Sequence, residues 1–215
     1  MDFSVFSKIF PLFLQGTLIT VELAISALIF GTLIGIFLAL FKISHIKILN
    51  FFSSFYIWFF RGTPLLLQVM FIYFAMPGIG LELSPFAAGA LSLSLNLAAY
   101  MAEAIRGGII SIDTGQFEAS KALGFTYVQT MTKIILPQTI RVILPAVGNL
   151  SVSMLKDTSL VSAISLAELM RQAQQVYSTT FKLVEPFSLA AIFYLLLTTI
   201  FTKVYGMIEK KLAIY

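Results

Sequence analysis

The chain has 215 residues, of which 59% are hydrophobic and only 11% are Asp, Glu, Lys or Arg. Ordinary soluble domains carry about 25% charged residues, so this composition excludes a typical soluble enzyme or binding module. There is no cysteine and one histidine, His45, which excludes disulfides and any His/Cys metal cluster within the chain. The net charge of +4 reports membrane orientation rather than nucleic-acid binding, because the basic residues lie between long apolar segments. The sequence therefore predicts an integral membrane protein.

Five apolar segments are predicted to cross the membrane as helices of one domain that covers residues 1–215, which makes the fold class all-α. The predicted spans cover about residues 11–41, 50–76, 86–108, 142–164 and 186–207. The first exceeds the ~20 residues that a bilayer requires, and its Gly31 and Gly35 would let another helix approach closely. The second is interrupted at residues 61–64, where Pro64 lacks a backbone donor and predicts a bend.

The Lys and Arg residues predict the orientation of the chain. Most of them fall in three segments that five spans would place on the same side of the membrane: Lys42, Lys47, Arg61, Arg106, Lys121, Lys133, Arg141, Lys203, Lys210 and Lys211. Positively charged loops face the cytoplasm, which predicts an outside N-terminus and a cytoplasmic C-terminus. Arg61 is expected to anchor the bend at the cytoplasmic interface.

Residues 111–137 form the longest run of mixed polar character. Their pattern predicts a short helix, a turn that ends it, and a second helix. Asp113 is a helix cap, and Gln116 three residues later completes the pattern of a capping box. Gly124 stands where a helix ends, and a second helix is predicted from about Tyr127. Such a polar turn between apolar segments would present a surface to the aqueous phase, and its first helix carries an apolar stripe of Phe117, Ala119, Ala122 and Leu123.

The same residues carry a family resemblance. Glu118-Ala119-Ser120, Gly124 and Ile135-Leu136-Pro137 resemble the EAA loop of the permease subunits of bacterial ABC importers. Other motifs resemble the polar amino-acid permeases in particular: Arg61-Gly62-Thr63-Pro64, Ala99-Tyr100, Glu103 with Arg106, and Lys156-Asp157-Thr158-Ser159-Leu160. The resemblance extends from about Gly16 to the C-terminus, with Ser120 in place of the third EAA alanine. It implies the type I importer arrangement of the five helices.

The resemblance also implies the partners. A separate cytoplasmic ATPase would dock on the EAA-like segment through Glu118, Ala119, Ser120, Gly124, Leu136 and Pro137. A second permease subunit, expected to be a copy of this chain, and an extracytoplasmic amino-acid-binding protein would complete an importer in the bacterial inner membrane. The sequence contains no Gly-x-x-x-x-Gly-Lys-Ser/Thr loop. ATP and Mg²⁺ are therefore expected on the partner, with no enzyme activity and no cofactor on this chain.

Polar residues inside the predicted spans are the candidates for solute contact. Carboxylates at membrane depth are costly and mark a pathway or a buried pair. The predicted set is Glu103, Asn96, Asp157, Glu22, Thr158 and Ser159, and Arg61 is left out of it. Repeated carboxylates favour a basic amino acid (arginine, lysine or histidine), with glutamine as the nearest alternative. Structural readings stay open, because Glu103 could pair with Arg106 and the other two carboxylates could serve helix packing.

Two functions of other classes are alternatives to an ATP-driven permease. A proton-coupled secondary transporter could use Glu22, Glu103 or Asp157, but the sequence shows no inverted repeat of the kind many such transporters have. An intramembrane enzyme would need a nucleophile with a base or a paired metal site, whereas the single histidine lies in a predicted loop.

Overall fold

The computed structural model describes residues 3–213, and every regular element in that range is a helix or a helical turn. In chain order these are α1 (Phe3–Ile43), α2 (Lys47–Gly62), α3 (Leu65–Met70), η1 (Phe71–Ala75), η2 (Met76–Ile79), α4 (Pro85–Ile110), α5 (Thr114–Ala122), α6 (Tyr127–Thr130), η3 (Met131–Ile135), α7 (Leu136–Asp157), η4 (Thr158–Ile164), α8 (Leu169–Thr180) and α9 (Val184–Ala213).

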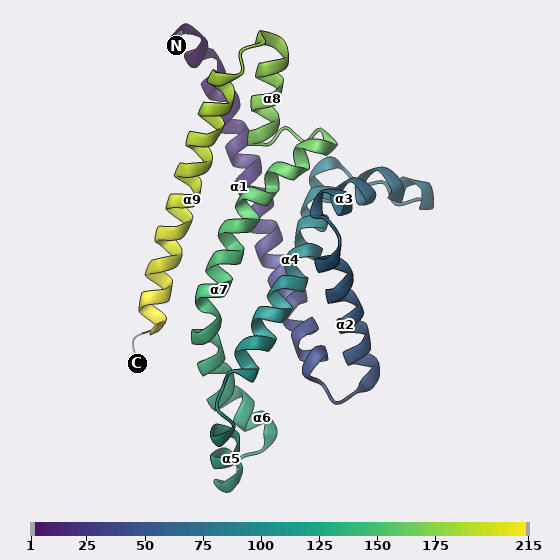
Figure 1. The fold of residues 1–215 in the computed structure, drawn as a ribbon, viewed down its shortest axis with the longest axis vertical. Coiled ribbons are helices and arrows are strands. Elements are labelled where there is room, and N and C mark those ends of the chain that lie inside the picture. The colour runs from purple at the N-terminus through teal and green to yellow at the C-terminus, as the bar shows by residue number, and fades with distance from the viewer. Residues whose placement is uncertain (1–2, 214–215) are drawn as a thin grey trace.

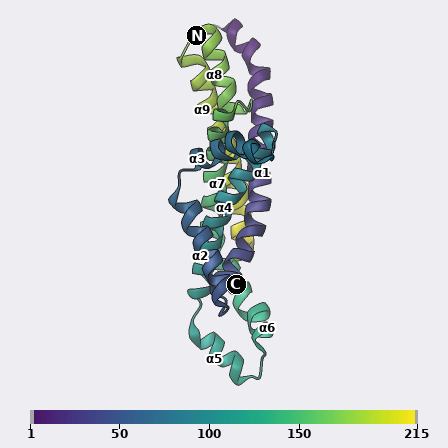
Figure 2. The same ribbon diagram turned by 90° about the vertical axis from the view of Figure 1, so that its right-hand side faces the viewer.

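The long helices α1, α4, α7 and α9 run side by side and form an elongated bundle (Figure 1). Helices α5 and α6 project from one end of this bundle, and α8 lies at the opposite end (Figures 1 and 2). The close pair at the centre is α1 and α4, as the spacing of Gly31 and Gly35 predicts. A Cβ atom on Gly35 would lie 2.8 Å from Met101 Cβ, and one on Gly31 would lie 3.0 Å from Leu97 Cβ. Both glycines therefore permit backbone approach.

Four helical stretches within the described residues are long and apolar enough to cross a membrane: Ile9–Ile43, Pro85–Ile110, Tyr127–Ile164 and Val184–Leu212. A fifth candidate is the pair Lys47–Gly62 and Leu65–Ile79, which is bent by 103°. This is the bend expected from residues 61–64, with Pro64 as the N-cap of α3. Beyond it, α3 and the turns that follow extend sideways from the bundle (Figure 1).

Two π-helical turns, η1 and η3, each end two residues before a proline, Pro77 and Pro137 respectively. A proline donates no backbone hydrogen bond and its ring clashes with the preceding turn, so a locally wider helix relieves both problems. At Pro137 the helical run continues, and the predicted span 142–164 is therefore the second part of a longer stretch that begins at Tyr127.

Helix α8 is polar in composition, yet one face packs into the bundle against α1 and α9. The buried residues of this second core are Ile9, Phe13, Leu169, Ala173, Val176, Leu189 and Ala190. Gly16 on α1 permits the approach, since a Cβ atom there would lie 2.8 Å from Gln172 Cγ. Apolar side chains on one face of α8 outweigh its polar composition because they can be buried against two neighbours.

Candidate substrate cavity and candidate ATPase-coupling segment

A cavity of about 500 Å³ lies where the bend after α2 meets α4 and α7. Its polar lining comes from three segments that are far apart in sequence: Arg61 and Thr63 at the bend, Asn96 and Tyr100 on α4, and Ser153 and Asp157 on α7. The cavity thus combines a guanidinium, a carboxylate, an amide and hydroxyl groups. This set can hold a small zwitterion by both of its charges.

The amide of Asn96 fixes the bend that shapes this cavity. Its Nδ2 donates to the backbone oxygen of Phe60 at 3.1 Å and to Gln68 Oε1 at 3.0 Å. Gln68 Nε2 in turn bonds the oxygen of Phe60 at 2.9 Å and Thr63 Oγ1 at 2.8 Å. These two buried amides therefore satisfy backbone groups that the break between α2 and α3 leaves without helical partners.

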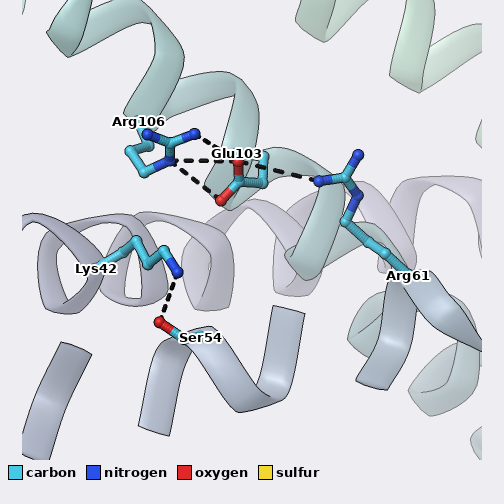
Figure 3. A network of polar contacts seen from close by, with 5 residues as sticks. All are labelled: Lys42, Ser54, Arg61, Glu103 and Arg106. Carbon is cyan, nitrogen blue, oxygen red and sulfur yellow. Dashed lines mark hydrogen bonds and ion pairs between the residues drawn. The ribbon is translucent and has the colours of Figure 1, made fainter. Parts of the chain in front are cut away.

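Two arginines engage Glu103 (Figure 3). Glu103 does not line the cavity. Arg106 Nη2 donates to its Oε2 at 2.8 Å, and Arg61 Nη1 lies 4.0 Å from the same oxygen. Lys42 lies on the other side of the cluster and donates to Ser54 Oγ on α2 (Figure 3). The guanidinium carbon of Arg61 is 5.2 Å from the centre of the Tyr100 ring. Glu103 is thereby placed to hold Arg61 at the cavity wall.

The six residues predicted for solute contact are thus only partly brought together. Asn96 and Asp157 line the cavity, and Glu103 reaches it through Arg61. Glu22 is exposed on α1, Thr158 is fully buried and donates to the backbone oxygen of Leu155 at 2.7 Å, and the half-buried Ser159 lies outside the cavity lining.

Sequence reasoning missed Arg61. Expected with the basic loop at the interface, it lies at the opposite end of α2 from Lys47 and lines the cavity. The sequence feature that could have predicted this position is the neighbouring Gly62 and Pro64, which break the helix. A broken helix within a membrane is tolerated where it lines a cavity, so a polar residue beside the break is a candidate for the cavity lining.

The EAA-like segment has the predicted helix–stop–helix form. Asp113 caps α5 by accepting from the Gly115 backbone N–H at 2.6 Å. Gly124 ends α5 with φ of 77°, and the Phe125 N–H bonds the oxygen of Ser120 at 3.0 Å, as in a Schellman motif. The expected capping box at Gln116 is wrong. The Gln116 side-chain oxygen accepts from Gln138 instead, and the capping box is formed by Thr126 and Gln129.

The residues predicted to contact an ATPase occupy different positions in this segment. Glu118, Ala119 and Pro137 are exposed, Leu136 is half-buried against the core, and Gly124 sets the turn. Ser120 is 1% exposed and donates to the oxygen of Gln116 at 2.6 Å, so its side chain belongs to the interior of the segment. Three large apolar residues stand exposed at the tip of the projection: Leu123, Tyr127 and Val128.

Comparison with known proteins decides the family. The model of the "binding-protein-dependent transport system inner membrane component" matches residues 31–214. The chain belongs to this family. It is an inner-membrane, multi-pass permease of an ABC amino-acid importer, without enzyme activity of its own. Membership implies a separate ATPase and a binding protein as partners.

Relatives agree over nearly the whole length of this permease. A Rickettsia bellii (strain RML369-C) protein named as a glutamine transport system permease is 42% identical over 93% of this chain and 92% of its own length. The arginine transport system permease ArtQ of Bacillus subtilis (strain 168) is 39% identical over 99% of this chain and 97% of its own. A solved chain described as an amino acid ABC transporter with histidines has a TM-score of 0.92 and 41% identity, covering 98% of this chain and 99% of that one.

Proposed function

We propose that this permease imports basic amino acids (arginine, lysine or histidine) through a homodimer, and that the cavity between α2, α4 and α7 is its solute site. The observation that carries the proposal is that Arg61, Asn96 and Asp157 line the same cavity. In this arrangement Arg61 takes the solute carboxylate and Asp157 takes an ammonium group. Both Nδ2 hydrogens of Asn96 are engaged at the bend, so its Oδ1 is the group left to accept from a solute.

Charge balance supports a basic solute over glutamine. Glu103 lies against Arg61 and Arg106, and it offsets part of the positive charge beside the cavity. Asp157 adds a carboxylate to the cavity lining, which can form an ion pair with the cationic side chain of a basic amino acid but not with the neutral amide of glutamine. The names of similar proteins support both choices, since one relative is named for glutamine and another for arginine.

The projecting segment supplies the proposed contact with the ATPase. Leu123, Tyr127 and Val128 are exposed at its tip, and Glu118 and Ala119 are exposed on α5. An exposed apolar group rimmed by polar residues is typical of a protein interface. Glu118 would pair with a basic residue of the ATPase, and Gly124 would hold the two short helices at the angle that the contact requires.

The polar face of α7 supports a second permease subunit. Asn149, Ser153 and Lys156 are exposed on this helix and line a cavity that α9 completes with Thr202 and Glu209. Polar side chains within a span require protein or water around them rather than lipid. A second copy of the chain facing α7 would provide that environment and close the solute pathway.

The test uses the permease in liposomes with its ATPase and binding protein, and reads ATP hydrolysis while single amino acids are titrated. Arginine, lysine or histidine should stimulate hydrolysis more strongly than glutamine. Asp157→Asn should raise the KM for basic amino acids roughly tenfold, the effect of losing about 1.4 kcal/mol of binding, while basal hydrolysis persists. Glu82→Gln, in an exposed loop, is the matched control.

Equal stimulation by glutamine would contradict the basic-substrate proposal. Uptake that stops when the proton gradient is collapsed, with ATP still present, would instead favour the proton-coupled alternative. An unchanged KM in Asp157→Asn would remove Asp157 from the solute site.

A further inference from the structure

The carboxylate of Glu168 is buried at the junction of α1, α8 and α9. Its side chain is 0% exposed. As the N-cap of α8, it accepts from the Arg171 N–H at 2.7 Å and from the Met170 N–H at 2.8 Å. The hydroxyl of Tyr194 on α9 donates to its Oε2 at 3.0 Å. One carboxylate thus ties the start of α8 to α9.

Helix α1 joins the same cluster through Thr20, which is also fully buried. Thr20 Oγ1 accepts from the Leu169 N–H at 3.2 Å, and its side chain interacts with both Glu168 and Tyr194. Because Gly16 brings α1 against the first turn of α8, this contact is part of a close helix pair. Three helices therefore meet at one carboxylate.

The cluster reaches the substrate cavity through Thr158. This residue, at the start of η4, is fully buried and its side chain interacts with the Tyr194 hydroxyl. Asp157, the preceding residue, lines the cavity. Contacts of the Tyr194 hydroxyl with Glu168 and with Thr158, together with one peptide link, thus connect the Glu168 carboxylate to the proposed solute-binding wall.

Among the described residues, no basic side chain forms an ion pair within 4.0 Å of the Glu168 carboxylate. The guanidinium of Arg171 turns to Gln174 Oε1 at 3.5 Å. Glu22 on α1 is exposed, Asp157 faces the cavity, and the charged residues of α9 nearest to Tyr194 lie two or more turns away, at Glu185 and Lys203.

Burial raises the pKa of Glu168 from 4.5 to about 7, although its hydrogen bonds act in the opposite direction. The folded protein therefore holds a proton here that the unfolded chain releases near pH 4.5. The stability that this proton contributes is complete below about pH 4.5 and is lost as the pH rises through about 7.

We propose that Glu168 is a positioning residue whose proton occupancy sets how firmly α1, α8, α9 and η4 hold the Asp157 wall of the cavity. With the proton bound, the junction is neutral and tight. When it ionises, a buried charge remains that hydrogen bonds stabilise but no basic side chain neutralises, which loosens η4 and weakens solute binding. Only this last step rests on the proposed solute site.

The experiment compares the unaltered chain with Glu168→Gln, which resembles the protonated side chain in size and charge, and uses Glu82→Gln as control. Infrared titration of the purified permease should show a protonated-carboxyl band that disappears as the pH rises through about 7 and is absent in Glu168→Gln. The melting temperature should fall between pH 5 and 8 in the unaltered chain and the control, and less in Glu168→Gln.

In the reconstituted importer, the KM for whichever amino acid stimulates hydrolysis should rise with pH, by at most about tenfold per pH unit for one proton. In Glu168→Gln it should stay at the low-pH value. Tyr194→Phe, which removes a donor to the carboxylate, should shift the infrared transition to higher pH and serves as the second variant if Glu168→Gln does not fold.

A band that persists in Glu168→Gln, or activity lowered equally at every pH, would overturn the proposal. A titrating band with a KM that does not depend on pH would overturn the link to the cavity. If glutamine alone stimulates ATP hydrolysis, the proposal of a basic substrate is wrong. The infrared and melting results would still test the role of Glu168.

Discussion

Arg106 binds the carboxylate of Glu103 one turn away on α4, with its Nη2 2.8 Å from Oε2 and its Nε 3.2 Å from Oε1. Arg61, at the end of α2, lies 4.0 Å from the same carboxylate and also lines the cavity. From the sequence, Glu103 is assigned to solute contact and Arg61 is left out, yet the two side chains lie together. Glu103 can therefore act on the solute directly or by holding Arg61 in place.

Glu103→Gln should separate a positioning role from direct solute contact. If Glu103 holds Arg61 in place, the KM should rise by a similar factor for every amino acid that is transported. If it contacts the solute, the KM should rise for basic amino acids alone. The loss of the ion pair should also cost about 1 kcal/mol of stability, since both partners are partly solvated. Kinetics and melting curves check this, with Glu82→Gln as control.

The amides of Asn96 and Gln68 should act as one unit. Replacing either by an apolar residue of similar size, as in Asn96→Leu or Gln68→Met, leaves the oxygen of Phe60 or Thr63 short of a donor and should cost about 1–3 kcal/mol. Because the two side chains share partners, the double variant should cost less than the sum of the single variants. Strict additivity in a double-mutant cycle of melting measurements would contradict the shared network.

Gly35→Ala should destabilise the contact between α1 and α4. The new methyl group would lie 2.8 Å from Met101 Cβ and 3.1 Å from the oxygen of Ala98, where backbone cannot yield easily. Overpacking of this kind costs about 1–3 kcal/mol. The matched control is Gly206→Ala on α9, where no atom lies within 4 Å of the added carbon. Equal melting temperatures for the two variants would show that α1 and α4 are not packed as described.

Gly124→Ala should weaken coupling to the ATPase more than it weakens the bundle. At φ of 77° an alanine costs about 1–2 kcal/mol, which would favour another geometry for the turn between α5 and α6. We expect less ATPase to copurify, and less solute-stimulated hydrolysis, with little change in the melting of the membrane helices. Gly107→Ala, in open space on α4, is the control, and a normal ATPase complex in Gly124→Ala would contradict the role of this turn.

The sequence by itself determined the features that depend on neighbouring residues. Long apolar runs gave the spans, Asp113 and Gly124 bounded α5, and residues 61–64 predicted the break between α2 and α3. Gly31 and Gly35 also predicted a close helix pair, although not that α4 would be the partner.

Only the tertiary structure decided which polar groups are buried and which meet. Arg61 and Asp157 line the same cavity although 95 residues separate them, and Ser120 faces the inside of a segment whose neighbours are exposed. Glu168 belongs to a helix with polar composition, yet Thr20 and Tyr194 enclose it from α1 and α9. Whether a side chain is buried depends on contacts with residues far apart in the chain. A local pattern of charge or hydropathy therefore cannot predict it.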